Sequence, residues 1–187
     1  GLDRPRAKNP KAIKSLLKRA VLEQNRQLLM EAKSESGYED MGATLVAVII
    51  KAGRAYIANL GDSRVYRLRK GRLVQLTKDH SVVSELLRKG RIEPEQAEGH
   101  EASGQITHYI GMEEKPVPYM HSFTLKGKDR LLLCTDGLTD MVDDEAITDI
   151  LKKQTDPQSA GVQLVNTANE AGGFDNITAV IVDWLGS

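Results

Sequence analysis

The sequence predicts an α+β fold in which helices pack beside antiparallel β-sheets. Apolar, β-branched segments follow one another with only short turns between them, at residues 51–54 and 70–71. Connections this short join antiparallel strands, because a parallel pair needs a crossover of a dozen or more residues. Two helices are expected near the C-terminus, one capped by Asp143 and one starting at Asp156-Pro157. Paired helices beside hairpin-built sheets give a layered α+β domain.

The length and composition are those of one globular domain covering residues 1–187, with 40% hydrophobic and 28% charged residues. The formal net charge is zero, which argues against nucleic acid or a membrane surface as the main partner. No apolar run approaches the roughly 20 residues that span a bilayer. The single cysteine, Cys134, rules out an internal disulfide framework and predicts a cytoplasmic protein. Because Cys134 lies in an apolar run, we expect a buried thiol rather than a nucleophile.

The N-terminal half is predicted to hold one long helix followed by two hairpins. Residues 1–8 are charged and are expected to form a loose arm. A capping side chain followed by proline, Asn9-Pro10, predicts the start of an amphipathic helix that ends near Ser34. Four strands should follow, at residues 44–50, 55–60, 65–69 and 72–76.

Residues 81–107 differ in character from the strands before them. They hold a short helix near residues 82–87 and a polar stretch at 98–105 with few side chains able to fill a core. We therefore expect a mobile flap insertion over the edge of the sheets rather than a second domain. Beyond it, strands are predicted at residues 106–110, 117–125 and 131–134, and a last strand at 177–182 is predicted to be buried on both faces.

Three aspartates occupy the same kind of place, where an apolar strand meets a glycine-containing turn. These are Asp62, Asp136 and Asp175. Strands that are neighbours in a sheet could bring all three to one end of the core, and Asp140 could face the same side on a helical turn. Converging carboxylates repel one another unless a hard cation lies between them, and ligands that are all oxygen favour magnesium or manganese over zinc.

Each aspartate also has a purely structural interpretation. Asp136 or Asp140 could cap a helix, Asp62 could brace Arg64 or a turn, and Asp175 could form an Asx-turn. Taken singly these interpretations are the simpler ones, whereas three such placements together favour a metal site. A calcium site of structural purpose could be built from the same carboxylates.

Five motifs, in order and with suitable spacing, resemble those of the type 2C metal-dependent serine/threonine protein phosphatases, in the family's bacterial branch. The resemblance runs from about residue 9 to residue 184. Three of these motifs are Gly61-Asp62-Ser63-Arg64, Thr135-Asp136-Gly137-Leu138-Thr139-Asp140 and Gly173-Phe174-Asp175-Asn176-Ile177-Thr178. The other two are similar to flanking signatures of the family, and they are Met41-Gly42-Ala43-Thr44-Leu45 and Thr77-Lys78-Asp79-His80-Ser81.

The resemblance implies a β-sandwich flanked by helix pairs, with a Mn²⁺ or Mg²⁺ centre at one end. It implies that Asp136 and Asp175 bind the main metal pair, that Asp62 shares a third metal with Asp136, and that Asp140 adds a further oxygen. No protein side chain acts as nucleophile in this family, since a metal-bound water attacks phosphorus in line. The implied partners are phosphorylated proteins, whose phosphoserine and phosphothreonine would be hydrolysed in signalling, with residues 81–107 as the flap beside the substrate.

Three N-terminal features of the family are not found in residues 1–187. They are an arginine that grips phosphate, an acidic pair, and an Asp-Gly-x-Gly-Gly turn that bridges the metals. Two strands and a helix of the family fold are absent with them, so we expect an N-terminally incomplete sandwich of reduced or no activity. The alternative is a degenerate phosphatase-like binding module. Either form should leave strand edges exposed, through which the chain could self-associate.

Overall fold

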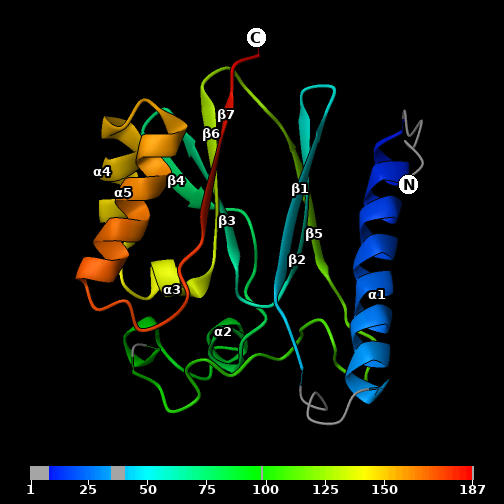
Figure 1. Cartoon of the computed structure of the whole chain (residues 1–187). Coiled ribbons are helices and arrows are strands. Elements are labelled where there is room, and N and C mark those ends of the chain that lie inside the picture. Colours follow the sequence, from blue (N-terminus) through cyan, green and yellow to red (C-terminus); the bar gives the residue numbers. More distant parts are fainter. Residues whose placement is uncertain (1–8, 35–40, 98, 187) are drawn as a thin grey trace.

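Two antiparallel sheets lie face to face in the computed structural model, which describes residues 9–34, 41–97 and 99–186 (Figure 1). The three-stranded sheet has the order β1 (Leu45–Lys51), β2 (Arg54–Leu60), β5 (Tyr119–Thr124). The four-stranded sheet has the order β4 (Arg72–Gln75), β3 (Arg64–Arg69), β6 (Asp129–Cys134), β7 (Ala179–Trp184). Every strand pairing is antiparallel. The predicted α+β class, with an antiparallel sandwich, is confirmed.

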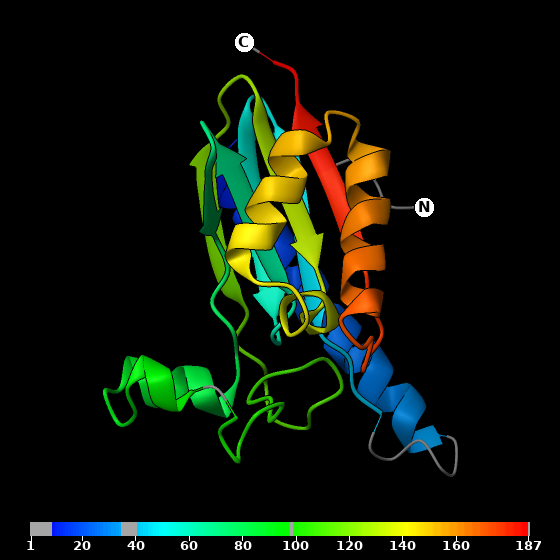
Figure 2. The ribbon, with the colours of Figure 1, turned by 90° about the vertical axis from the view of Figure 1, so that its left-hand side faces the viewer.

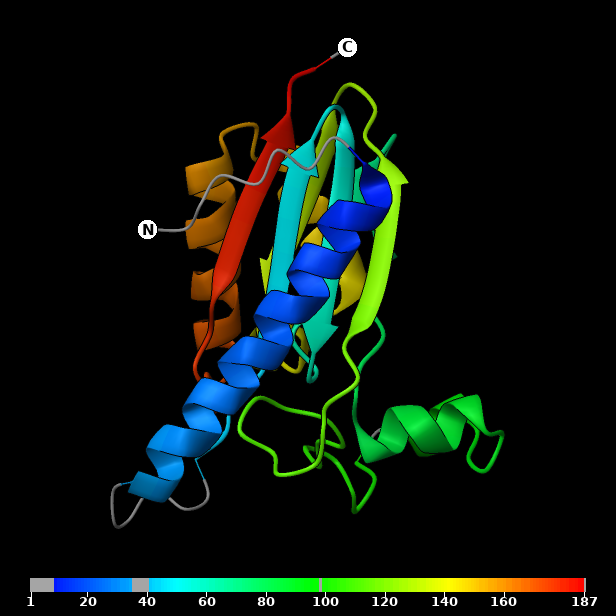
Figure 3. The same ribbon diagram turned by 90° about the vertical axis from the view of Figure 1, so that its right-hand side faces the viewer.

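Helices cover the outer faces of both sheets. Helix α1 (Pro10–Ser34) crosses the outer face of the three-stranded sheet (Figure 3), and Asn9 caps it by accepting from the backbone N–H of Lys11 at 2.9 Å. Helices α4 (Asp144–Lys153) and α5 (Pro157–Glu170) lie on the four-stranded sheet (Figure 2). Asp143 and Asp156 cap them as predicted. The arm expected at residues 1–8 lies outside the described residues.

The core between the sheets is closed by side chains such as Ile57 and Val65, which are fully buried. Cys134 belongs to the second core, between the four-stranded sheet and its helices, and its residue is 2% exposed. Burial raises the pKa of the Cys134 thiol to about 12, so the group is a neutral thiol at pH 7, in agreement with the expected inert role. In the part of the chain that the structure describes, no helix is long and apolar enough to cross a bilayer.

Two strand predictions were wrong. Residues 106–110 form no strand. They make only isolated bridges, between Ser81 and Ile106 and between Ala43 and Ile110. The last strand, β7, is not buried on both faces, since Val180 is 48% exposed. The cause is its position at the edge of the sheet, where β6 is its one neighbour.

Residues 81–107 protrude beyond one end of the sandwich (Figure 2) and hold α2 (Val82–Arg88) and the 3₁₀ turn η1 (Pro94–Gln96). The two ends of this segment are joined by backbone hydrogen bonds. Val82 donates to Gln105 O at 2.9 Å, and Thr107 donates to His80 O at 2.7 Å. The segment is therefore a loop whose two ends are joined at its base. We call this base (residues 80–82 and 105–107) the neck.

A buried arginine ties α4 to the four-stranded sheet. Arg130 of β6 is 8% exposed and forms a bidentate pair with Asp183 of β7, at 2.6 and 2.7 Å. Its other N–H groups donate to the carbonyls of Leu151 and Thr155, each at 2.8 Å, and to that of Gln154. The last carbonyls of a helix have no partner inside the helix, so Arg130 completes the end of α4.

Candidate metal site

The register of the four-stranded sheet brings three of the predicted aspartates to one end. Arg64 of β3 pairs with Cys134 of β6, which in turn pairs with Ala179 of β7. The three aspartates lie just outside these strand ends, at Asp62, Asp136 and Asp175. This is also the end that carries the short helix α3 (Asp136–Thr139) and lies nearest to residues 81–107 (Figure 1).

Asp62 is the most buried of the four, at 9% exposed. Desolvation, and then the charge of Asp136, raise the pKa of its carboxyl to about 6. The turn that carries it requires glycine at position 61, where φ is +104° and a Cβ atom would lie 2.5 Å from Thr44 Cγ2. The sequence thus places a buried carboxylate in a turn that requires glycine, close enough to Asp136 to be affected by its charge.

Asp136 begins α3, directly after the apolar strand β6. Thr135 holds the N-cap position, and the Asp136 Oδ1 atom accepts from the N–H of Gly137 at 2.9 Å. Asp140 follows at the C-cap, where its N–H donates to Asp136 O at 2.8 Å. The residue Asp140 as a whole is exposed, yet desolvation of its carboxyl, and then the charges of Asp136 and Asp175, raise its pKa.

Asp175 lies in an exposed turn that is clamped to the start of α3. Its Oδ1 atom accepts from the N–H of Asn176 at 2.6 Å. The Thr135 hydroxyl donates to Asn176 O at 3.0 Å and accepts from the N–H of Thr178 at 2.9 Å. Thr135 therefore fixes the distance between the turns that carry Asp136 and Asp175.

Gly137 allows the closest approach of these two turns, and we expect Gly137→Ala to separate them. A Cβ atom at position 137 would lie 2.6 Å from the backbone oxygen of Asn176. Overpacking of this kind costs about 1–3 kcal/mol, so chemical denaturation should show that loss together with weaker Mn²⁺ binding by calorimetry. The matched control is Gly161→Ala, whose nearest neighbour atom would be 3.8 Å away. Equal Mn²⁺ affinity in both variants would contradict the expectation.

A further buried carboxylate, Asp79, was missed as a contributor to this end of the sheet. Arg64 pairs with Asp79 at 2.7 Å, and Gln75 donates to its other oxygen at 2.9 Å. Arg64 is thus engaged by Asp79 rather than braced by Asp62. Asp79 lies in the motif Thr77-Lys78-Asp79-His80-Ser81, but its pairing with Arg64, 15 residues away, has no local signal in the sequence.

The donor chemistry of this end of the sheet fits a hard divalent cation. Asp136 acts electrostatically on both Asp62 and Asp140, raising both pKa values. A divalent cation relieves such repulsion, and carboxylate oxygens are the ligands that Mg²⁺ and Mn²⁺ prefer. Within residues 9–34, 41–97 and 99–186, however, no three Asp, Glu, His or Cys side chains converge closely enough to hold an ion. The carboxylates therefore affect one another electrostatically, but in the described residues they do not form a complete set of metal ligands.

Comparison with known proteins identifies the family. The sequence model of protein phosphatase 2C matches residues 2–184. The chain belongs to the protein phosphatase 2C family. It is 40% identical to the serine/threonine phosphatase stp of Listeria welshimeri over 171 residues, covering 91% of this chain and 68% of that relative.

Solved structures of the phosphatase family agree with this assignment. The structure of serine/threonine phosphatase Stp1 from Staphylococcus aureus matches with a TM-score of 0.91 and 32% identity, over 98% of this chain and 72% of that one. The catalytic domain of PstP in complex with two manganese ions matches with a TM-score of 0.81 and 32% identity, over 97% and 74%. The predicted family, the type 2C serine/threonine protein phosphatases, is confirmed by the sequence model and by the relatives. The bound manganese ions are those of PstP.

Proposed function

We propose that this chain provides carboxylates for the Mn²⁺- or Mg²⁺-dependent hydrolysis of phosphoserine and phosphothreonine in proteins. The observation that carries the proposal is the buried Asp62 carboxyl, whose pKa is raised to about 6 beside Asp136, in a chain of the phosphatase 2C family. When bound, the metal supplies an acidic water for attack on phosphorus and stabilises the charge that develops there.

The described residues have distinct parts in this proposal. Asp62 and Asp136 would hold a divalent cation, and Asp175 and Asp140 would provide further carboxylate oxygens near Asp136. Thr135 and Gly137 keep the turns of Asp136 and Asp175 together through the contacts with Asn176 and Thr178. The one cysteine of the chain, Cys134, is buried and neutral and so is excluded as a nucleophile. Its reduced thiol supports a cytoplasmic setting for the enzyme.

We propose further that residues 1–187 alone have reduced or no activity. No Asp-Gly-x-Gly-Gly sequence occurs in these residues, and no three ligand-type side chains converge in their described part. The second candidate, a binding module without catalysis, rests on the same observation. In that case the loop at residues 81–107, or an open sheet edge, would be the surface that contacts the partner.

The test measures phosphate release and metal binding side by side. The chain is incubated with a phosphothreonine peptide and with p-nitrophenyl phosphate, in Mn²⁺, in Ca²⁺ and in chelator, while calorimetry measures the affinity for both cations. Release that requires Mn²⁺ supports the enzyme, and Mn²⁺ binding without release supports the binding module. Preference for Ca²⁺ would indicate the structural calcium site, and binding of neither cation would contradict the metal proposal.

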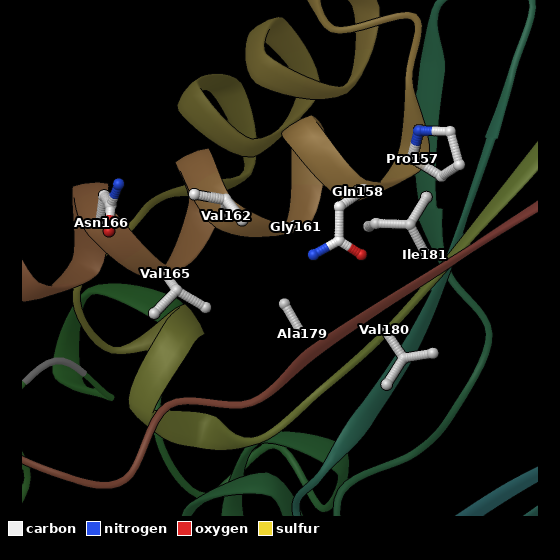
Figure 4. A pocket seen from close by; sticks show the side chains of 9 residues that line it. All are labelled: Pro157, Gln158, Gly161, Val162, Val165, Asn166, Ala179, Val180 and Ile181. Carbon is white, nitrogen blue, oxygen red and sulfur yellow. The ribbon is translucent and has the colours of Figure 1, made fainter.

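Self-association through the β7 edge is part of the same proposal. A groove of about 620 Å³ lies between α5 and β7, and Figure 4 labels the residues that line it, all from those two elements. Val162 and Val180 are about half exposed there, and no lining residue is charged. A second copy of the chain is the occupant we propose, because an uncharged edge in a protein of zero net charge meets its own copy without repulsion.

Val180→Lys is expected to prevent this association, since a lysine on an edge strand opposes strand pairing. Sedimentation velocity over a range of concentrations should show dimer for the parent chain and monomer for the variant. The control is Val117→Lys, which changes a valine that is 62% exposed outside the strands and should leave the dimer intact. A parent chain that stays monomeric at high concentration would contradict the proposal.

A further inference from the structure

His80 lies at the junction of the Asp62 turn and the neck of the 81–107 loop. Its backbone N–H donates to Gly61 O at 3.0 Å, and its ring Nδ1 accepts from the N–H of Gly61 at 3.2 Å. Both backbone groups of Gly61 are thus bound by one residue, next to Asp62. Its backbone oxygen meanwhile accepts from Thr107 at 2.7 Å, across the neck.

The hydrogen bond to Nδ1 requires a neutral imidazole ring in one particular tautomer. Because Nδ1 is the acceptor, the proton of the neutral imidazole is on Nε2. Burial, and then the neighbouring His108, lower the pKa of His80, which keeps the Nδ1 lone pair available at pH 7. The His108 ring lies edge-on to it, with ring centroids 5.2 Å apart and planes at 83°. His80, on one side of the neck, therefore contacts Thr107 on the other side and His108 just beyond it.

The side chain of Asn59 also binds this turn, but it contacts only the carbonyl of Gly61 and not its N–H. Asn59 is fully buried, and its Nδ2 donates to Gly61 O at 3.2 Å and to Lys78 O at 3.0 Å. The Gly61 carbonyl thus has two donors, whereas its N–H has the His80 ring. Loss of the ring acceptor would leave that N–H without its bond and loosen the turn at the residue before Asp62.

We propose that His80 is a positioning residue for the Asp62 carboxylate, linking the turn that carries it to the neck of the 81–107 loop. This inference rests on the proposed metal-binding role of Asp62. His80 holds Gly61 in its left-handed conformation, and with it the turn that carries the Asp62 carboxyl, which the charge of Asp136 affects. The same residue transmits the position of the neck to that carboxyl, so cation binding at Asp62 and order at the neck support each other.

The test compares His80→Leu with His80→Asn in the otherwise unchanged chain. Leucine removes the acceptor, whereas the Oδ1 atom of asparagine can occupy the place of Nδ1. We expect the Gly61 amide to exchange hydrogen about tenfold faster in His80→Leu and Mn²⁺ to bind about fivefold more weakly, as for the loss of one hydrogen bond. His80→Asn should restore both quantities to within about twofold of the parent. Exchange at Leu132, in the centre of β6, reports whether the fold is intact.

The outcomes separate this inference from the proposed function. Asparagine and leucine variants that behave alike, or a leucine variant that matches the parent, would overturn the role of His80. A parent that binds no Mn²⁺ overturns the proposed function, and Gly61 exchange still decides whether His80 holds the turn. If His80→Leu exposes Leu132 to exchange, His80→Gln replaces it. Its acceptor is displaced toward Nε2, so it should loosen Gly61 without unfolding the sheet.

Discussion

Replacing Asp136 with alanine is expected to lower the affinity for Mn²⁺, and with it any Mn²⁺-dependent kcat/KM of the chain, by at least about a hundredfold, since changes even to residues behind the ligands of metal sites cost 10- to 100-fold. Asp136 is the carboxylate that acts electrostatically on both Asp62 and Asp140. The variant lacks the negative charge that acts on both of these carboxylates, and we therefore expect a lower affinity for the cation. The measurement is p-nitrophenyl phosphate hydrolysis at saturating and limiting Mn²⁺, with calorimetric Mn²⁺ affinity as a readout that needs no catalysis.

The matched control is Asp149→Ala. Asp149 is a half-exposed aspartate on α4 that lies 3.8 Å from the ammonium groups of Lys152 and Lys153. Its loss should leave both activity and Mn²⁺ affinity as in the parent. An Asp136→Ala variant that retained more than about a tenth of the parent's Mn²⁺ affinity would contradict the shared role of Asp136.

Replacing Arg130 with methionine is expected to lower the free energy of unfolding by about 3–5 kcal/mol, the usual cost of removing one partner from a buried ion pair. The methionine keeps an apolar stem but leaves Asp183 without its bidentate partner. It also leaves the carbonyls of Leu151, Gln154 and Thr155 without their donor. Urea denaturation at pH 7 measures the change.

Two comparisons show whether the loss comes from the uncompensated charge. The double variant Arg130→Met with Asp183→Asn should recover part of the stability, because no charge then remains unpaired at that position. The exposed pair of Arg26 with Glu23, at 2.6 Å on α1, provides the surface control, and Arg26→Met should leave the unfolding free energy unchanged. A loss below about 1 kcal/mol for Arg130→Met would show that this network contributes little.

The sequence predicts those elements whose signals are local. Asn9, Asp143 and Asp156 each precede a helix that they cap, and the turns at 51–54 and 70–71 each join an antiparallel pair. What the sequence leaves open is the assignment of strands to sheets. Strands β2 and β3 are consecutive yet belong to different sheets, because the left-handed Gly61 turn leads the chain from one sheet to the other. No local pattern encodes that transfer.

The candidate site shows the same division. Asp62, Asp136 and Asp175 could be proposed because each follows or precedes an apolar strand at a glycine turn. Asp79 and His80 could not, since their roles depend on contacts with Arg64 and Gly61, 15 and 19 residues away along the chain. The exposed edge at Val180 was also misjudged, because an apolar strand with one neighbour and one with two have the same composition.

The neck of the 81–107 loop has a consequence for how this protein can diversify. A bridge between Ser81 and Ile106 joins its two ends. Residues between these two positions can therefore be inserted or lost without changing the register of β3 with β6. Doubling the length of such a closed loop adds only about 0.6 kcal/mol of closure entropy. The surface beside the carboxylates can therefore vary in length and chemistry from one homologue to the next, while the sheet that positions the carboxylates keeps a single geometry.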